Sequence, residues 1–254
     1  MSNAATASSP EGPVHRAFTL LQLVAAAGEP VGVRELARRA GLSRSTTSRT
    51  LGILTELGMV ERTADGAARP GAGLATLTQR LDGSPAMLRE RFRALAAEMR
   101  RTYGENAAVG IDDGFGFLYL ASARVPAAVQ VADPLDRTYP FHLVAPGLVA
   151  MAAWPGERLE QYLSEPLATS TAYSVIGPAR IRKRLARIRR DGYAWTDQEL
   201  DLEVNGLAAP IADASGTTIA VATLYGPSYR FAEQLDAQLG NQFAAFVRER
   251  TAAG

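Results

Sequence analysis

Between residues 15 and 57 the sequence predicts three short helices, and the third of them changes character halfway along. The first two, His15 to Ala27 and Val33 to Ala40, carry apolar residues at helical spacing, and a glycine suited to a helix C-cap follows each. Ser43 is a favourable N-cap for the third, Arg44 to Leu57, whose apolar residues occupy only its second half. A helix used only for packing would continue its apolar stripe to the N-terminus.

The first half of this third helix presents hydroxyl and guanidinium groups, which suit phosphates and base edges. The candidate DNA-contacting residues here are Ser43, Arg44, Ser45, Thr46, Thr47, Ser48 and Arg49. The positive charge is local, because the whole chain has 27 Lys+Arg against 26 Asp+Glu. Together with the preceding helix and a Gly41-Leu42-Ser43 turn, the pattern predicts a helix-turn-helix whose second helix enters the major groove of double-stranded DNA.

A short β-hairpin is predicted directly after the third helix. Met59 to Thr63 is rich in strand-forming residues and Asp65-Gly66 is a hairpin turn. Pro70 cannot donate to a ladder, so the second strand should be short or lie at an edge. Arg62 and Arg69 flank the turn and are candidate phosphate contacts, which extends the prediction to a winged helix-turn-helix. The alternative is a small helical subdomain with a solvated basic face, but the order of these features favours DNA binding.

The hydrophobic period changes beyond residue 105, where strands, then helices, then strands again are predicted. This order is typical of an α+β domain with a mainly antiparallel sheet. The predicted strands are Ala107 to Ile111, a partner containing Phe117 and Tyr119, a third through Val129 and Val131 before Pro134, Gly206 to Ile211 and Thr217 to Leu224. The predicted helices are Val144 to Ala153, Pro178 to Asp191 and about Phe231 to Arg250. The basic face of Pro178 to Asp191 is interpreted as solvated, with nucleic acid as the alternative partner.

A connecting helix is predicted between the two modules, from Pro85 to Arg101. Its apolar residues Leu88, Phe92, Leu95 and Met99 form a heptad-like seam, which either packs on the following domain or pairs two subunits. Asp82 to Pro85 is the predicted hinge. The expected organisation is a DNA-binding domain over residues 12–72, a linker and connecting helix over 73–101, and a C-terminal domain over 102–254.

Two stretches of the sequence resemble one family. The run ELARRAGLSRSTTSRTLGILTELGMVER is similar to the DNA-binding domain of the isocitrate-lyase-regulator (IclR) family of bacterial transcription factors. GYAWTDQELDLEVNGLAAPIADASGTTIAVATLYGP resembles the end of that family's effector-binding domain, which is GAF-like. The resemblance implies a regulator, more often a repressor, that binds operator DNA as a homodimer or homotetramer. A small-molecule effector would modulate that binding.

The resemblance also implies an effector pocket near YPFHLVAPGLVAMA. Pro140, His142, Ala145 and Gly147 match the family pattern, whereas a hydroxyl residue is usual at Val144, a lysine at Leu148 and often a cysteine at Gly206. These departures remove polar groups and add volume, which favours an apolar or aromatic effector over a small dicarboxylate. The candidate effector-binding residues are Ile111, Tyr119, His142, Val144, Gly147, Asp197, Glu199, Asn205, Gly206 and Leu207.

Several of these assignments have alternatives. His142 is as readily a structural histidine bonded to backbone, and Asp197, Glu199 and Asn205 fit a solvated loop equally well. Ile111, Tyr119 and Leu207 lie on predicted strands, where core residues are commoner than pocket residues. The domain as a whole could also have lost ligand binding.

The sequence argues against enzyme chemistry, a cofactor or a metal. It has no cysteine and two histidines, and it contains no G-x-S-x-G, H-E-x-x-H or Walker A motif. His142 would be the only plausible catalytic base, so an enzyme built on the C-terminal domain stays open as one alternative. A ligand-binding or dimerising module whose helix-turn-helix contacts protein is the other. No apolar run approaches the roughly 18 residues that span a bilayer, so no membrane partner and a cytoplasmic location are expected.

Overall fold

The computed structural model describes residues 12–78, 85–127, 131–231 and 236–251. The chain divides into two compact units, Met1–Pro85 and Ala86–Gly254. Of the hinge predicted at Asp82 to Pro85, residues 82–84 lie outside the described residues, and Pro85 is the first residue of helix α5, Pro85–Tyr103.

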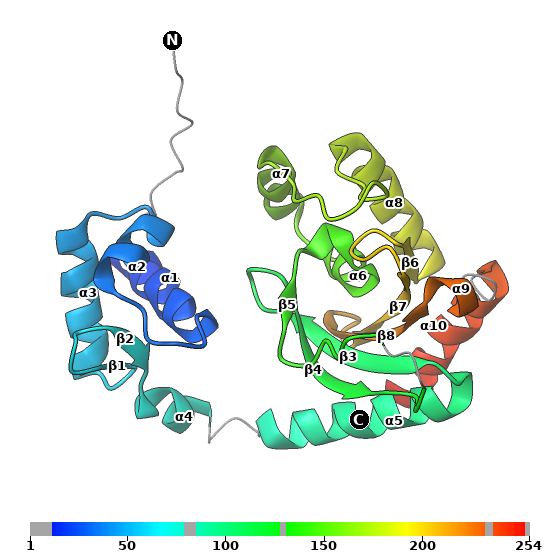
Figure 1. The fold of residues 1–254 in the computed structure, drawn as a ribbon, viewed down its shortest axis with the longest axis horizontal. Helices are drawn as coiled ribbons and strands as arrows, with labels where there is room; N and C mark the ends of the chain where they lie inside the picture. Colours follow the sequence, from blue (N-terminus) through cyan, green and yellow to red (C-terminus); the bar gives the residue numbers. More distant parts are fainter. Residues whose placement is uncertain (1–11, 79–84, 128–130, 232–235, 252–254) are drawn as a thin grey trace, which may run out of the picture. The chain divides into compact units, whose positions relative to one another are not determined.

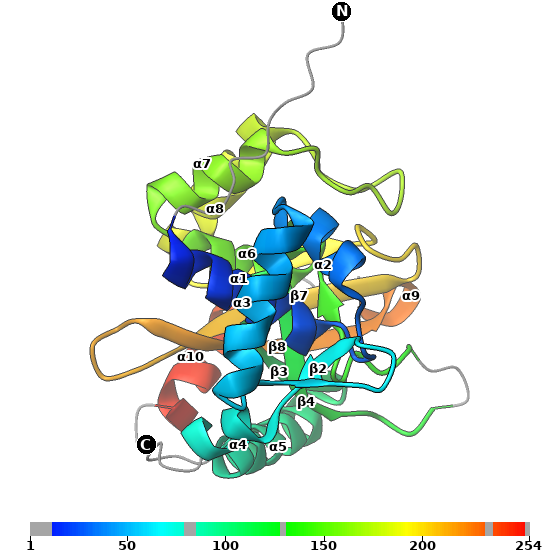
Figure 2. The same cartoon turned by 90° about the vertical axis from the view of Figure 1, so that its left-hand side faces the viewer.

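The first unit is a three-helix bundle with a two-stranded wing (Figure 2). Helix α1 spans Pro13–Ala26, α2 spans Val33–Ala40 and α3 spans Arg44–Glu56, which confirms the predicted helices to within two residues at each end. Leu20, Leu36 and Leu51, one from each helix, are fully buried in its core. The second helix ends as expected at Gly41, whose φ is 63°.

The wing consists of β1, Val60–Arg62, and β2, Ala68–Pro70, which pair antiparallel. Gly66 turns the chain between them with a φ of 81°. Pro70 closes the second strand, which has only three residues, as its missing donor led us to expect. The predicted hairpin is therefore confirmed. A further helix, α4, follows at Ala72–Thr78.

The second unit is built on one six-stranded antiparallel sheet in the order β5-β4-β3-β8-β7-β6. Its strands are β3 Asn106–Asp112, β4 Phe117–Ala123, β5 Thr138–Tyr139, β6 Ala194–Asp197, β7 Val204–Ala212 and β8 Thr218–Pro227. Together with the helices on its faces, this sheet confirms the predicted α+β fold.

Helices cover both faces of that sheet (Figure 1). Alternation along each strand sends side chains to both faces, so each face has its own apolar core. One core packs the sheet against α6 (Ala145–Ala152), α7 (Gly156–Ser164) and α8 (Pro178–Asp191). The other packs it against α5 (Pro85–Tyr103), α9 (Ser228–Phe231) and α10 (Ala237–Thr251). A 3-10 turn, η1 (Phe141–Leu143), leads into α6.

The structure decides between the two interpretations of the α5 seam. Phe92, Leu95 and Met99 are buried in the core of the α5 face, so the seam packs mainly on its own domain. Leu88 is 37% exposed. Helix α5 thereby belongs structurally to the second unit.

Several elements differ from the prediction. Val131 is in no strand, and Val129 lies outside the described residues. The third strand is instead β5, which comes after Pro134. Asp133 begins a turn there, since its carboxylate accepts the Leu135 amide proton at 3.1 Å. Helix α7 and strand β6 were not predicted, and the C-terminal helical region forms α9 and α10. In the part of the chain described, no helix is long and apolar enough to cross a membrane.

Candidate functional site

The N-terminal half of α3 forms the exposed surface of the helix-turn-helix. Arg44, Ser45, Ser48 and Arg49 are all exposed. They follow the N-cap Ser43, whose hydroxyl oxygen accepts the Thr46 amide proton at 3.1 Å, as predicted. The cap fixes the first turn of α3, so that both arginines project from an ordered helix end.

Thr47 does not belong to this surface, and its assignment as a DNA-contacting residue was wrong. Its side chain is fully buried, and its hydroxyl donates to the Ser43 carbonyl at 3.0 Å. Thr47 lies four residues before Leu51, so the two side chains share the face of α3 that packs into the core. Thr46 is half-buried, and its hydroxyl lies 2.9 Å from that of Ser43.

The two wing arginines make local contacts. Arg62 Nη1 donates to the Gly66 carbonyl at 2.8 Å, and Arg69 pairs with Glu61 at 2.8 Å. Both partners of the Arg69–Glu61 pair are largely exposed, and exposed ion pairs contribute little to stability. Phosphate can therefore compete for Arg69 at small cost.

A pocket of about 110 Å³ opens on the α6 side of the sheet. Four of the predicted effector-binding residues line it: Tyr119, Val144, Asn205 and Gly206. The sequence reasoning missed its other walls, which are Val131, Ala132, Pro134, Tyr139, Leu143, Ala145, Pro146, Thr196, Leu200, Asp201, Val204, Thr223 and Tyr225. Aromatic and aliphatic side chains dominate this lining.

Gly206 leaves space in the pocket wall. A Cβ at this position would lie 3.3 Å from the Thr196 hydroxyl oxygen and 3.5 Å from the Ala145 Cβ. The first distance is tighter than an ordinary contact, so a side chain here would fill the gap between β6 and α6. The expectation that glycine adds room at this position agrees with this geometry.

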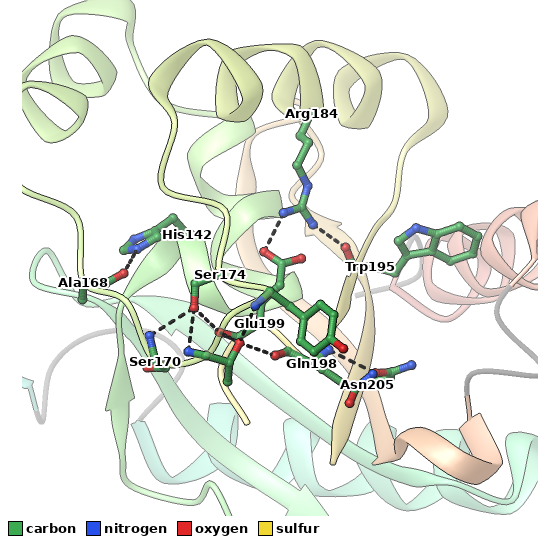
Figure 3. A network of polar contacts seen from close by, with 11 residues as sticks. His142, Ala168, Ser170, Ser174, Arg184, Trp195, Gln198, Glu199 and Asn205 are labelled. Carbon is green, nitrogen blue, oxygen red and sulfur yellow. Dashed lines mark hydrogen bonds and ion pairs between the residues drawn. The ribbon is translucent and has the colours of Figure 1, made fainter. Parts of the chain in front are cut away.

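His142 does not line the pocket, and both its ring nitrogens are occupied within the fold. His142 is 1% exposed, and its Nδ1 lies 2.7 Å from the Tyr162 hydroxyl. Its Nε2 lies 2.9 Å from the Ala168 carbonyl oxygen (Figure 3). A carbonyl can only accept, so Nε2 carries the proton and Nδ1 accepts from Tyr162. Burial lowers the pKa of His142, which keeps the ring neutral. This geometry fits the structural alternative for His142 rather than a ligand contact in the pocket.

Gly147 is also a packing residue rather than a pocket residue. A Cβ there would lie 2.2 Å from the Phe141 carbonyl oxygen. Glycine therefore lets α6 approach η1 closely. Gly147 does not line the pocket, although Val144 to Pro146 just before it do.

Ile111 and Leu207 lie on the opposite face of the sheet from the pocket. Leu207 is fully buried in the α5 and α10 core, and Ile111 packs against the same core. The side chain of Leu207 enters that core, whereas Tyr225, which pairs with Gly206, belongs to the core on the other face of the sheet. Neither residue lines the pocket, and both fit the alternative that they are core residues.

Glu199 anchors the loop between β6 and β7 instead of facing a ligand. Its carboxylate accepts from Arg184 Nη1 at 2.7 Å, and Arg184 Nη2 donates to the Trp195 carbonyl at 2.7 Å (Figure 3). Glu199 is 5% exposed, so the charge is buried but paired. Glu199 does not line the pocket, and its burial contradicts the solvated-loop alternative for this residue.

The backbone of that loop is held by hydroxyl groups from the segment before α8. The Thr171 hydroxyl donates to the Gln198 carbonyl at 2.7 Å, and the Ser174 hydroxyl donates to the Glu199 carbonyl at 2.7 Å. The Ser170 amide in turn donates to the Ser174 hydroxyl at 3.0 Å (Figure 3). These bonds order the loop that carries Leu200 and Asp201 to the pocket.

The two remaining polar candidates differ in burial. Asn205 is buried beside the pocket, where its Oδ1 accepts the Gln198 amide proton at 3.2 Å. Asp197 is exposed and does not line the pocket; its carboxylate accepts from the Gln198 side chain at 3.2 Å. Asp197 therefore fits the solvated-loop alternative.

The described residues contain no group of three or more His, Cys, Asp or Glu side chains placed to hold a metal ion. A winged helix-turn-helix with two exposed arginines, on the same chain as an α+β domain with a small pocket, defines a ligand-responsive transcriptional regulator.

Comparison with known proteins agrees with that class. The family model of the bacterial transcriptional regulator IclR C-terminal domain matches residues 84–250, and the IclR helix-turn-helix domain model matches residues 13–64. The chain belongs to the IclR family of bacterial transcriptional regulators, as its resemblance predicted. It is a transcriptional regulator with a helix-turn-helix DNA-binding domain and a ligand-binding C-terminal domain, and its relatives are named as regulators rather than enzymes.

Two relatives illustrate the range of the similarity. The HTH-type transcriptional regulator Rv1719 of Mycobacterium tuberculosis is 28% identical, over 92% of this chain and 89% of the relative. The transcriptional repressor IclR of Escherichia coli is 25% identical, over 94% of this chain and 88% of the relative.

Solved structures share the fold. A putative IclR regulator from Silicibacter superposes with a TM-score of 0.79 at 24% identity, covering 96% of this chain and 97% of that one. An IclR homologue from Microbacterium hydrocarbonoxydans, crystallised with 4-hydroxybenzoate, has a TM-score of 0.66 at 23% identity, covering 96% of this chain and all of that one.

Proposed function

We propose that this regulator is a repressor that binds its operator as a dimer and is modulated by a small aromatic or apolar effector. The single observation that carries the DNA-binding half is the exposed Arg44, Ser45, Ser48 and Arg49 surface at the N-terminus of α3. In a helix-turn-helix this end of the second helix enters the major groove, where arginine can bond guanine bidentately.

The wing supplies the remaining DNA contacts. Arg62 and Arg69 flank a hairpin turn next to α3, and we assign them to backbone phosphates. One winged domain reads one half-site, so a two-fold dimer is needed for a specific operator. Because the chromosome is in the cytoplasm, we place the protein there.

The part of the proposal that concerns the effector rests on the pocket beside Gly206. Its lining is mainly apolar and aromatic, and the family's usual hydroxyl, lysine and cysteine positions are occupied by Val144, Leu148 and Gly206. The relative crystallised with 4-hydroxybenzoate supports a one-ring ligand for this fold. Repression is supported by the relatives named as repressors.

Fluorescence anisotropy with the upstream region of the protein's own gene tests this proposal. Tighter binding of that fragment than of a random duplex supports the proposal. The double variant Arg44→Ala, Arg49→Ala should lose this preference. Sedimentation of the complex should give two chains per site. If the double variant keeps full operator affinity, the assignment of the reading surface is wrong.

An enzyme with His142 as base has no support in the site. The ring is neutral and buried, and both nitrogens are bonded to Tyr162 and Ala168. Neither nitrogen is available to a substrate proton.

A further inference from the structure

We propose that the pocket selects an uncharged one-ring ligand carrying a hydrogen-bond acceptor, and that the Tyr225 hydroxyl is the group that recognises the acceptor. This inference rests on the function proposed above, in which the same pocket receives the effector. It adds a chemical class for the ligand and a specificity-determining residue.

Tyr225 is positioned by the register of β7 and β8. It pairs directly with Gly206, and paired residues in an antiparallel sheet place their side chains on the same face. Tyr225 belongs to the core on the α6 side and lines the pocket, and its side chain is more than nine-tenths buried. Its hydroxyl has no hydrogen-bond partner in the described part of the chain. A buried hydroxyl without a partner costs free energy, so a ligand that supplies an acceptor recovers it.

Two further tyrosines complete the wall. The rings of Tyr119 and Tyr139 meet edge to face, with centroids 5.6 Å apart and an interplanar angle of 83°. Burial raises the pKa of Tyr119 and of Tyr225 well above the usual tyrosine value. Both phenols therefore stay protonated and act as donors at neutral pH. The aromatic edges and the adjoining Leu143 and Val144 suit the faces of a flat apolar ring.

The charge around the pocket disfavours an anion. None of the described residues that line it is Arg, Lys or His, and Asp201 is the one ionisable carboxylate among them. The nearby Arg124 is paired with Asp133 at 3.6 Å, so its charge is already balanced. A carboxylate placed in this pocket would meet no cationic side chain, and Pro146 removes one of the backbone N–H groups that the first turn of α6 would offer it, so an anion is held less well there than a neutral acceptor.

The size of the pocket limits the ligand. Its volume of about 110 Å³ is of the same order as the ~150 Å³ of an apolar protein cavity known to hold benzene, so the pocket has room for one ring and not for two. A polar substituent on that ring would have to be short. Fused rings and long chains do not fit.

Calorimetry on the full chain with benzamide, benzoate and benzylamine at pH 7 tests the ligand class, because the three share one ring and differ in charge. We expect benzamide to bind at least about tenfold more tightly than benzoate. A benzoate affinity equal to or higher than the benzamide affinity would overturn the inference. It would also be overturned if benzylamine bound most tightly of the three, because that would indicate a cation site.

Tyr225→Phe tests the recognising residue. The hydroxyl has no protein partner, so the variant should unfold at the same temperature as the wild type or higher, while benzamide affinity falls about five- to tenfold. Tyr103→Phe, a tyrosine on α5 that packs against Phe243 and Phe246, is the matched control and should not change affinity. Unchanged benzamide affinity in Tyr225→Phe would remove the assigned role.

The two proposals fail in different ways. If none of the three probes binds at millimolar concentration while the protein still prefers its promoter fragment, the ligand class is wrong and the DNA-binding function stands. If the promoter preference is absent but benzamide binds selectively, the ligand class stands and the proposed regulation fails.

Discussion

The Nδ1 atom of His142 lies 2.7 Å from the hydroxyl oxygen of Tyr162. This bond joins η1 to α7, and the Nε2 bond to the Ala168 carbonyl joins η1 to the chain beyond α7. A residue that the sequence placed in the effector pocket thus fastens three segments of the domain to one another. Its protonation therefore concerns folding rather than ligand binding.

Stability should fall on acidification through the titration of His142. Burial lowers the pKa of His142 in the folded state below the value of 6.5 expected in the unfolded chain. Below about pH 6.5 the unfolded chain therefore binds the proton more readily, and the free energy of unfolding decreases as pH falls toward the folded-state pKa. We expect thermal unfolding between pH 8 and pH 5 to show this loss.

The effect can be assigned with a pair of variants. His142→Gln should be less stable than the wild type at pH 8, but with a smaller further loss on acidification. His15→Gln, at the exposed first turn of α1, should leave the pH profile unchanged. Parallel profiles for the wild type and His142→Gln would contradict this account.

The reading surface predicts different effects for neighbouring residues of α3. Arg44→Ala or Arg49→Ala should weaken operator binding by about 1–3 kcal/mol and relax sequence preference at one position. Thr47→Val is the control: its hydroxyl is buried against the Ser43 carbonyl, so we expect a loss of stability without a change in sequence preference. Competition titrations with single-base operator variants measure both. A change of preference in Thr47→Val would mean that the inward placement of this residue is mistaken.

The Glu199–Arg184 pair should control the pocket through the loop between β6 and β7. Arg184 is 24% exposed and Glu199 is nearly fully buried. Because the arginine keeps some contact with water, we expect Glu199→Gln to lower the free energy of unfolding by about 2–3 kcal/mol, which is less than for a fully buried pair. Ligand affinity should also fall, because Leu200 and Asp201 are carried by this loop. Chemical denaturation and calorimetry measure the two effects. Glu160→Gln, which removes an exposed pair with Arg182, should change neither measurably.

Gly206→Ala should reduce ligand binding more than stability. The added Cβ would lie 3.3 Å from the Thr196 hydroxyl oxygen and 3.5 Å from the Ala145 Cβ. It would therefore fill pocket space, and the Thr196 side chain would have to move slightly. We expect benzamide affinity to fall about tenfold or more, with a stability change within about 1 kcal/mol. Gly177→Ala, where a Cβ would have ordinary contacts, serves as the control. Unchanged affinity in Gly206→Ala would place the ligand elsewhere.

Local signals predicted the elements of the fold well. The apolar spacing of α2 with Gly41 after it, the Ser43 cap and the hairpin glycine Gly66 all depend on residues close in the chain, and each appears where its pattern indicates. Helix α7 and the two-residue strand β5 were missed, and β5 is too short for period-two alternation to be recognised.

The pocket was harder to predict, because the residues that line it come together only through the pairing register of strands β7 and β8. A symmetrically closed turn at residues 213–216 would pair Gly206 with Thr223. The turn instead pairs Ala212 with Thr218, which shifts the register by one residue, and the irregularity between Ile211 and Ala212 shifts it by one more, so that Tyr225 lies opposite Gly206. The choice between Gly206 and Leu207 likewise depended on which face of β7 meets α6. Strand alternation would have excluded one of the two, but could not say which.

The most direct test of the account compares DNA affinity with and without a ligand. Anisotropy titrations at about 150 mM salt would use the gene's upstream fragment and a random duplex of equal length, each with and without saturating benzamide. The account predicts a clear preference for the upstream fragment and a change in that affinity, not in the random-duplex affinity, when benzamide is added. Equal affinity for the two duplexes in both conditions would contradict it.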